Sequence, residues 1–273
     1  NYLLIGTDAT GNNKNGADYQ GSMADFLMLV IVDKTENTYS FLQFNRDTMT
    51  EVALIDHNGE GEATANIQLC TAHWYGGNRE QSCENTVKSV KKLLGGIQID
   101  GYYELNMSEI PKLNSMVDGV TVTLEDDFSK KYPKMKKGAT INLDDEQAYA
   151  YVHDRYGVGD EENTSRMKRQ QQYMTGFFKK LQEKVKANPN YANEVFESLQ
   201  DVSTTDIAIG KISNISNIFA SGTDKGIFEL AGKSKIGQAL GDEMDHMEFY
   251  VNKKAMVSTM SELFGIVEQK NKE

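Results

Sequence analysis

Residues 24–33 of this chain read ADFLMLVIVD. The apolar run inside this stretch is continuous, which is typical of a central strand buried on both faces rather than of a half-exposed one. A turn at 34–37 and a second apolar run at 39–44 predict an antiparallel partner. The two runs therefore predict a hairpin in the middle of a sheet.

Strand and helix patterns alternate on both sides of this hairpin. Further strands are predicted at 2–5, 101–106, 120–124 and 248–251, and helices at 85–94, 108–117, 145–151, 166–186, 191–200, 206–219 and 255–267. Residues 49–83 show no clear period and are expected to form an irregular loop. No internal repeat interrupts the order. We expect a single α/β domain over 1–273. It should have three layers, α/β/α, in which the middle layer is a central mixed sheet.

Charged residues follow the ends of the predicted strands. Asp8 comes after the first strand, Asp25 before the second and Arg46 after the third. Antiparallel pairing brings the start of one hairpin arm to the end of the other, so Asp25 and Arg46 should meet. Two carboxylates together with substrate phosphates form a typical Mg²⁺ site. The alternative is a surface on which acids and arginines balance each other.

A second cationic cluster lies at 151–172, although the chain carries a net charge of −11. A helix capped by Thr164 or Ser165 would place Arg166, Arg169 and Gln170 on one face. Guanidinium forks near a helix N-terminus suit a phosphate or diphosphate. The alternative is a solvated basic face that is paired with the acidic residues at 160–162.

Composition excludes some partners. The acidic balance argues against nucleic acid and against broad adhesion to anionic membranes. No apolar run approaches the ~18 residues that a spanning helix needs. Because the chain starts at the edge of a strand, we interpret it as a trimmed domain whose parent could carry an anchor elsewhere.

The two cysteines, Cys70 and Cys83, are thirteen positions apart. A disulfide between them would close a loop worth ~3 kcal/mol in the chain-entropy model and would indicate an oxidising compartment. We expect this disulfide, with two free thiols as the alternative. Their spacing and the scattered histidines do not suggest a zinc site.

Five blocks of the sequence, taken in order, resemble LytR–CpsA–Psr domains. The blocks are LLIGTD (3–8), ADFLMLVIVD (24–33), NRDT (45–48), MVDGVTV (116–122) and SRMKRQQQ (165–172). They lie within 2–180, and 190–273 is expected to add C-terminal helices and a strand to the same domain. The resemblance implies an α/β/α fold with a long apolar pocket beside a cationic diphosphate site.

The same resemblance implies an enzyme at the extracytoplasmic face of a bacterial membrane. Such enzymes transfer wall teichoic acid, capsule or a similar glycopolymer from an undecaprenyl-diphosphate carrier to peptidoglycan, and a membrane tether is expected in the full-length parent. Hydrolysis of the diphosphate is the implied side reaction. The cofactor would be Mg²⁺ or Mn²⁺.

Site residues carry over by motif. Asp8 and Asp25 match the metal-binding aspartates, and Arg46 with Asp47 matches the Pro-Arg-Asp motif. Arg46 also belongs to the implied diphosphate set, whose other members are Arg155, Arg166, Arg169 and Gln170.

The sequence departs from the family pattern at several positions. An arginine is missing after Asp8, and Met23, Asn45, His153 and Asn163 stand where other residues are usual. Since each charge-assisted hydrogen bond contributes roughly 1.5–3 kcal/mol, these losses would weaken diphosphate binding. A non-catalytic domain that binds polyprenyl phosphate or glycan is therefore the second hypothesis. A soluble sugar or nucleotide phosphatase is a third, with no phosphate-loop or histidine metal motif to support it.

The predicted helix after 166 carries an apolar stripe formed by Met167, Met174, Phe177, Phe178, Leu181 and Val185. At helical spacing such a stripe is most often core. The resemblance adds a second interpretation, in which the stripe lines a lipid pocket.

Overall fold

A computed structural model of the protein describes residues 1–8, 19–61 and 63–265. Its centre is a six-stranded mixed sheet with the strand order β10-β3-β2-β1-β6-β9. These strands are β1 (Tyr2–Thr7), β2 (Ala24–Asp33), β3 (Thr38–Gln43), β6 (Gly101–Asn106), β9 (Ser203–Thr205) and β10 (Thr223–Glu229). β2 pairs antiparallel with β1 and β3, whereas β1–β6 and β3–β10 are parallel. The predicted hairpin and mixed sheet are confirmed.

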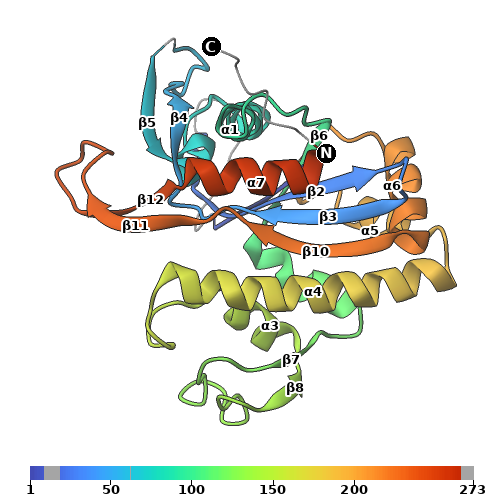
Figure 1. Cartoon of the computed structure of the whole chain (residues 1–273). Coiled ribbons are helices and arrows are strands. Elements are labelled where there is room, and N and C mark those ends of the chain that lie inside the picture. The colour runs from blue at the N-terminus through green and yellow to red at the C-terminus, as the bar shows by residue number, and fades with distance from the viewer. Residues whose placement is uncertain (9–18, 62, 266–273) are drawn as a thin grey trace.

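Helices cover both faces of the sheet (Figure 1). On one face lie α1 (Arg79–Leu93) and α7 (Lys253–Phe264); on the other lie α4 (Asn163–Ala187), α5 (Tyr191–Ser198) and α6 (Ile209–Ser221). Beyond α4, the short helices η2 (Met107–Glu109), α2 (Ile110–Met116) and α3 (Asp145–His153) share an apolar core with it. In the part of the chain that is described, no helix has the length and hydropathy to cross a membrane. The predicted three-layer α/β/α arrangement is confirmed.

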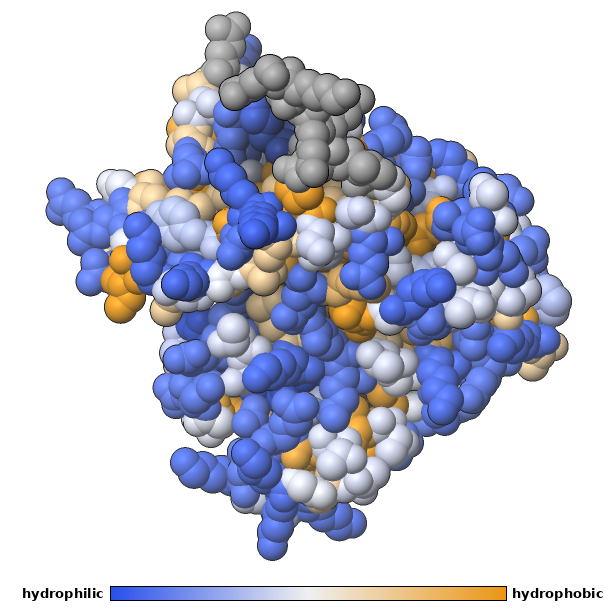
Figure 2. Space-filling model, in the orientation of Figure 1, coloured by the Kyte–Doolittle hydropathy of each residue, from blue (hydrophilic) through white to orange (hydrophobic). Residues whose placement is uncertain are grey.

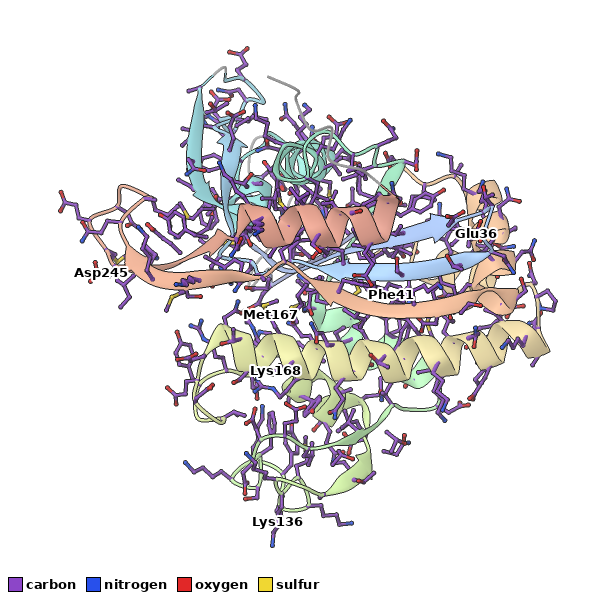
Figure 3. All side chains as sticks on the ribbon, in the orientation of Figure 1. Glu36, Phe41, Lys136, Met167, Lys168 and Asp245 are labelled. Atoms are coloured by element: carbon purple, nitrogen blue, oxygen red, sulfur yellow. The ribbon has the colours of Figure 1, made fainter. Side chains whose placement is uncertain are left out.

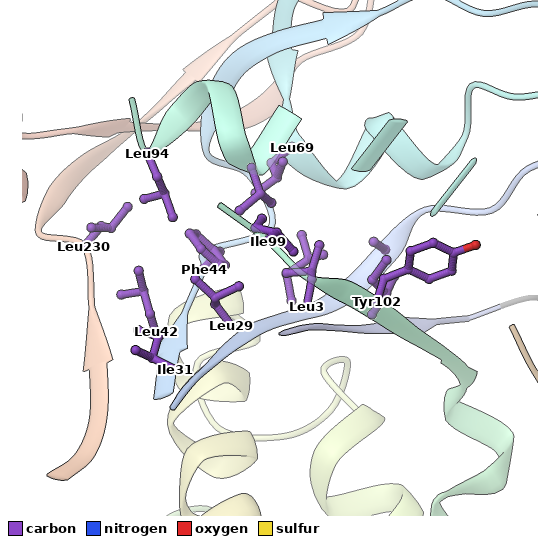
Figure 4. Packing of buried hydrophobic residues seen from close by; sticks show 14 of the residues in the cluster. Leu3, Leu29, Ile31, Leu42, Phe44, Leu69, Leu94, Ile99, Tyr102 and Leu230 are labelled. Atoms are coloured by element: carbon purple, nitrogen blue, oxygen red, sulfur yellow. The ribbon is translucent and has the colours of Figure 1, made fainter. Parts of the chain in front are cut away.

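Side chains of the central strands alternate between the two faces. Leu27, Leu29 and Ile31 pack in the core beneath α1 and α7, together with Leu42 of β3 (Figure 4). Met28 packs in a separate cluster on the α4 side. This alternation follows from the period of two along a strand, and it explains why the 24–33 run is apolar at nearly every position.

Three small two-stranded sheets surround this centre. They pair β4 (Met49–Ala53) with β5 (Thr64–Gln68), β7 (Thr121–Thr123) with β8 (Thr140–Asn142), and β11 (Gly232–Gly237) with β12 (His246–Val251). The expectation of an irregular 49–83 is therefore wrong, because β4, β5 and the 3₁₀ helix η1 (Leu69–His73) occupy much of it. Only Val52 and Ile67 supply a buried apolar contact between the two strands, which is too sparse to show as a period in the sequence.

Candidate active site at the strand ends

Asp25 owes its orientation to a β-bulge. Gly6 pairs with Phe26 and Thr7 pairs with Ala24, which leaves Asp25 as one extra residue on β2. Ala24 belongs to the core beneath α1, whereas Phe26 packs on the α4 side. Strict alternation would put both on one face, so the bulge has changed the phase. Bulges recur next to active sites because they re-aim side chains in this way.

Asp8 directly follows β1 and contacts His153 at the end of α3. Nε2 of His153 lies 3.0 Å from Oδ2 of Asp8, and Nδ1 lies 3.2 Å from Oδ1 of Asp154. The hydrogen bond to Asp154, aided by the one to Asp8, raises the pKa of His153 against the opposing effect of burial. The imidazole thus stands beside Asp8 at a position where the resemblance led us to expect an arginine.

Arg46 follows β3 and forms an ion pair with Asp25. The predicted meeting of these two residues at the open end of the hairpin is confirmed. Oδ1 of Asp47 lies 3.5 Å from Nε of Arg46. Nη2 of Arg46 also contacts two sulfur atoms, Sδ of Met23 at 2.9 Å and Sγ of Cys70 at 3.3 Å.

Arg166 reaches the same place from the first turn of α4. Its Nη2 lies 3.5 Å from Oδ1 of Asp25 and donates to Oδ1 of Asn163 at 2.9 Å. Burial, together with the neighbouring charges of Arg46 and Arg155, lowers the pKa of Arg166 to about 10. Positive charge is therefore crowded into a partly dry region, where a bound anion would be stabilised.

The start of α4 differs from the predicted one. Thr164 or Ser165 was expected to cap a helix that begins near 166, but α4 begins at Asn163. Nδ2 of Asn163 donates to Oδ1 of Asn45 at 3.2 Å and lies 3.4 Å from Oδ2 of Asp47. A tertiary contact to the end of β3, rather than a local cap, therefore holds this first turn.

Arg155 completes the cluster from the segment after α3. Its guanidinium donates to the hydroxyl of Tyr156 and stacks over that ring, 4.6 Å from the centroid. Burial raises the pKa of Asp47, while Arg46, Arg166 and Arg155 act to lower it. Three arginines from three segments of the chain therefore act on one carboxylate.

Arg169 is used differently from its neighbour on α4. Only 1% of its side chain is exposed. Nε donates to the carbonyl of Tyr151 at 2.9 Å, Nη1 to Oδ2 of Asp126 at 2.6 Å, and Nη2 to the carbonyl of Asp154. Arg169 thus ties α4 to the end of α3, and its predicted contact with a diphosphate stays a prediction.

Gln170 is buried between the charged cluster and the space beneath the sheet. Its Nε2 donates to the carbonyl of Val152 at 3.1 Å, and its Oε1 accepts from Nε2 of Gln43 at 3.2 Å. These bonds orient the amide at the boundary between a polar and an apolar region.

Two buried donors of this cluster lack an acceptor. Nε of Arg46 and Nε of Arg166 are inaccessible and make no hydrogen bond within the described residues. Leaving a buried donor unpaired costs about 1–3 kcal/mol. Both atoms belong to the arginines that surround Asp25, so the charged cluster is not fully satisfied by hydrogen bonds within the described residues.

An apolar cavity of about 310 Å³ lies between the sheet and the helices on the α4 side. Phe41 of β3, labelled in Figure 3, faces this space opposite α4. No charged side chain is among its described lining residues, which come from β1, β2, β3, β6, η2, α2, α3, α4, α5, α6 and adjoining segments. Those on the helices include Met174, Phe177, Phe178, Leu181, Val195, Phe196, Ile212, Ile215 and Phe219.

One end of the cavity reaches the charged cluster. Gly6, Phe26, Val152 and Gln170 line the cavity, and each lies within two residues of Asp8, Asp25, His153 or Arg169. The apolar stripe of α4 therefore faces a cavity as well as core. That this cavity takes a lipid stays a prediction.

The predicted disulfide is wrong. Cys70 and Cys83 are both free and buried. Sγ of Cys70 faces Arg46, and Sγ of Cys83 lies 3.6 Å from Nε2 of His73. Burial raises the pKa of both thiols. The 3₁₀ helix η1, which contains Cys70, packs on α1, which contains Cys83, without a covalent link between them.

Met23, Cys70 and Gln43 are parts of the site that sequence reasoning did not identify. Met23 was noted only as a departure from a family motif, and Cys70 was assigned to a disulfide. None of them has a local sequence signal for this role, because their contacts with Arg46 and Gln170 are long-range.

The fold and site together define a class of α/β/α protein, with a charged cluster at the strand ends that opens into an apolar cavity. A family profile described as LytR_cpsA_psr matches residues 1–264. The chain belongs to the LytR–CpsA–Psr family, as the five sequence blocks predicted. Membership supports a role in cell-wall glycopolymer transfer at the cell envelope.

Solved structures share the fold at low sequence identity. The protein gbs0355 from Streptococcus agalactiae has 20% identity and a TM-score of 0.74, covering 96% of this chain and 85% of that one. TagV of B. subtilis has 19% identity and a TM-score of 0.71, with 97% of each chain covered. A structure described as TagT bound to LI-WTA has 20% identity and a TM-score of 0.68, with coverages of 96% and 88%. No curated protein matches the sequence.

Proposed function

We propose that this protein transfers a glycopolymer from a polyprenyl-diphosphate carrier to peptidoglycan. The observation that carries the proposal is the junction of an uncharged apolar cavity with a buried cluster of arginines and aspartates. An amphiphile with a long hydrocarbon chain and a diphosphate head matches this pair of environments. Structural likeness to TagT bound to LI-WTA agrees with a wall glycopolymer as cargo.

In this proposal the polyprenyl chain occupies the cavity and the diphosphate lies among Arg46, Arg155 and Arg166. The guanidinium groups of Arg46 and Arg166, whose side chains are 19% and 8% exposed, would bond phosphoryl oxygens. Gln170 lies where the polyprenyl chain would meet the diphosphate. The arginines would hold the head group in place and stabilise the negative charge that develops during transfer.

Asp8 and Asp25 supply a donor set that fits Mg²⁺ or Mn²⁺. Within the described residues no three His, Cys, Asp or Glu side chains group together to hold a metal ion. Two carboxylates at adjacent strand ends nevertheless suit an ion that takes its remaining oxygens from diphosphate and water. When bound, such an ion would neutralise charge on the phosphates.

The proposed reaction breaks one P–O bond and forms another. A peptidoglycan hydroxyl oxygen attacks the phosphorus that carries the glycopolymer, and the lipid monophosphate leaves. The hydroxyl proton needs an acceptor. Asp47 is our candidate, because burial raises its pKa and it lies next to Arg46. Water in place of the acceptor would give hydrolysis of the diphosphate.

A second candidate is a non-catalytic receptor for polyprenyl phosphate or glycan. Two observations favour it. His153 stands beside Asp8 in place of an arginine that is usual in the family. Arg169 uses three of its donors in hydrogen bonds within the protein. This candidate predicts lipid binding without turnover.

One experiment separates the two candidates. Release of lipid phosphate from a polyprenyl-diphosphate glycan is measured with and without Mg²⁺, for the native protein, Asp8→Ala and the exposed control Asp201→Ala. We expect Mg²⁺-dependent release that Asp8→Ala loses and Asp201→Ala keeps. Tight binding of the substrate with no release under any condition would instead establish the receptor.

A further inference from the structure

A fully buried carboxylate lies on the face of the sheet that is turned away from the cavity. The surface of the molecule is mostly hydrophilic in the view of Figure 2, as expected for a chain with a net charge of −11. Among the described residues, Glu104 and Glu248 are the only buried acidic side chains, and Glu104 is 0% exposed. A charge without access to water has to be paired inside the protein, so the partners of Glu104 indicate what it does.

Glu104 of β6 has one partner for each carboxylate oxygen. Its Oε1 accepts a hydrogen bond from Oγ1 of Thr7 at 2.7 Å, and its Oε2 forms an ion pair with Nη2 of Arg79. Tyr103 and Leu105, on either side of Glu104 in the strand, line the cavity on the other face. Thr7 ends β1 and Arg79 begins α1. The carboxylate therefore joins a strand end to the helix that covers it.

Thr7 is the residue at which the ladder between β1 and β2 becomes irregular. The register shifts between Gly6 and Thr7, and Thr7 pairs with Ala24 beyond the bulge. A bulge locally disrupts the ladder of hydrogen bonds, so backbone pairing with β2 fixes this strand end less firmly than the rest of β1. The hydroxyl of Thr7, bound to Glu104, supplies a further contact at this point.

The Thr7–Ala24 pair stands between the two aspartates that are our candidate metal ligands. Asp8 follows Thr7 in the chain, and Asp25 follows Ala24. Thr7 faces Glu104 beneath α1, whereas Asp8 contacts the end of α3 on the opposite side of the sheet. A shift of Thr7 would therefore move Asp8 relative to Asp25.

Stability by itself does not account for this buried charge. Replacing a buried ion pair by apolar residues of similar volume is often neutral or stabilising. A valine at position 7 would occupy nearly the same space as threonine without needing an acceptor. What the charged pair adds is one acceptor in a fixed place, because Arg79 holds the carboxylate of Glu104 against the hydroxyl of Thr7.

We propose that Glu104 is a positioning residue for the binding of a divalent cation. Held by Arg79, it fixes Thr7, and Thr7 in turn fixes the placement of Asp8 relative to Asp25. The inference rests on the part of the proposed function that assigns these two aspartates to a cation. Loss of a group that orients metal ligands typically costs roughly 10–100-fold in metal affinity, so the effect is large enough to measure.

The test measures binding of Mn²⁺ alone, without substrate, by electron paramagnetic resonance of the free ion. The variants are Thr7→Val, Thr7→Ser and Arg79→Met/Glu104→Met, and the control is Thr86→Val. Thr86 is a matched control because it is also buried and its hydroxyl donates to the carbonyl of Ser82 at 2.9 Å within α1. We expect Thr7→Val and the double variant to weaken Mn²⁺ binding roughly tenfold or more. Thr7→Ser, which keeps the hydroxyl, and Thr86→Val should bind Mn²⁺ as the native protein does.

Urea titrations of the same proteins separate a positioning effect from a general loss of stability. We expect Thr7→Val and Thr86→Val to lose similar free energy of unfolding, while only Thr7→Val loses affinity for Mn²⁺. Adding Thr7→Val to Arg79→Met/Glu104→Met should cause no further loss of affinity, because the hydroxyl of Thr7 acts through the carboxylate of Glu104.

Three results would overturn the proposal. The first is Mn²⁺ binding that Asp8→Ala leaves unchanged. The second is native affinity for Mn²⁺ in Thr7→Val or in Arg79→Met/Glu104→Met. The third is an equal loss of affinity in Thr86→Val. Because Mn²⁺ binding is read without turnover, a protein that binds Mn²⁺ through Asp8 but releases no lipid phosphate would refute the proposed transferase, and Thr7→Val would still decide the role of Glu104.

Discussion

Arg166 and Arg169 lie one turn apart on α4 and have the same side chain, yet their surroundings give them different roles. Arg166 sits among Arg46, Arg155 and Asp25 with one Nε donor unpaired. The described donors of Arg169 are directed at Asp126 and two carbonyls. The first arrangement is suited to a ligand and the second to holding two helices together.

We therefore expect opposite outcomes from two alanine substitutions. Arg169→Ala leaves Asp126 and two carbonyls without partners and should lower the free energy of unfolding by about 3–5 kcal/mol. Arg166→Ala removes a repulsive buried charge, so it should cost less stability but reduce turnover roughly 100-fold or more. Urea titrations and release of lipid phosphate check both. Equal stability losses in the two variants would contradict this division of roles.

The thiols give a second prediction for individual residues. Protein unfolded in guanidinium without reductant should take up two alkyl groups by mass spectrometry, since Cys70 and Cys83 are free. The native protein should take up none, because both thiols are buried and their pKa values are raised. If the unfolded protein took up alkyl groups only after reductant was added, Cys70 and Cys83 would have to be joined by a disulfide.

Among the elements, α5 and α6 have few buried residues although their apolar sides face the sheet. Ser216 is the one buried residue on α6, and α5 has none. Their apolar side chains are only partly covered because they line the cavity. These two helices are therefore the elements through which the size of the cavity can be changed without touching the charged cluster.

Filling the cavity from α5 should select against long lipids. Ala192 lines the cavity, while Ala187 at the end of α4 is exposed. Ala192→Trp should raise KM for a long-chain polyprenyl-diphosphate substrate roughly tenfold, since overpacking costs about 1–3 kcal/mol. A two-isoprene analogue should be unaffected, and Ala187→Trp serves as the control. Equal effects on both chain lengths would argue against the lipid assignment.

Across the whole molecule, stability depends on a buried histidine outside the charged cluster. His73 is buried, and burial lowers its pKa. Its Nδ1 lies 3.0 Å from the carbonyl of Ser22 and its Nε2 faces Cys83. As the pH falls below the unfolded value of about 6.5, the unfolded chain binds a proton that the folded chain does not. The free energy of unfolding should therefore decrease on acidification.

The predicted pH effect is measurable by difference. Protonation of His73 in the unfolded chain should lower the free energy of unfolding of the native protein by up to about 1.4 kcal/mol for each pH unit below 6.5. The effect is measured between pH 7.5 and 5.5. His73→Gln should remove that component, and the exposed control His57→Gln should keep it. Urea titrations at the two pH values give the answer. Identical pH slopes for native protein and His73→Gln would show that His73 is not the source.

Local pattern was enough to place the hairpin and part of the site. Antiparallel pairing of two adjacent runs brings Asp25 to Arg46 whatever the remaining fold, and the helical period puts Arg166 near Arg169. The five ordered blocks identified the family, whose profile then matched residues 1–264. These inferences succeeded because each depends on neighbours in the sequence or on an ordered set of motifs.

Only the tertiary structure decided how each side chain is used. The bulge at Asp25, the pairing of β4 with β5, the free thiols and the internal bonds of Arg169 all depend on partners distant in the sequence. An apolar helical stripe has the same period whether it faces a packed core or a cavity. The reason is physical: burial and hydrogen-bond partners belong to contacts between elements, and periodicity describes only one element at a time.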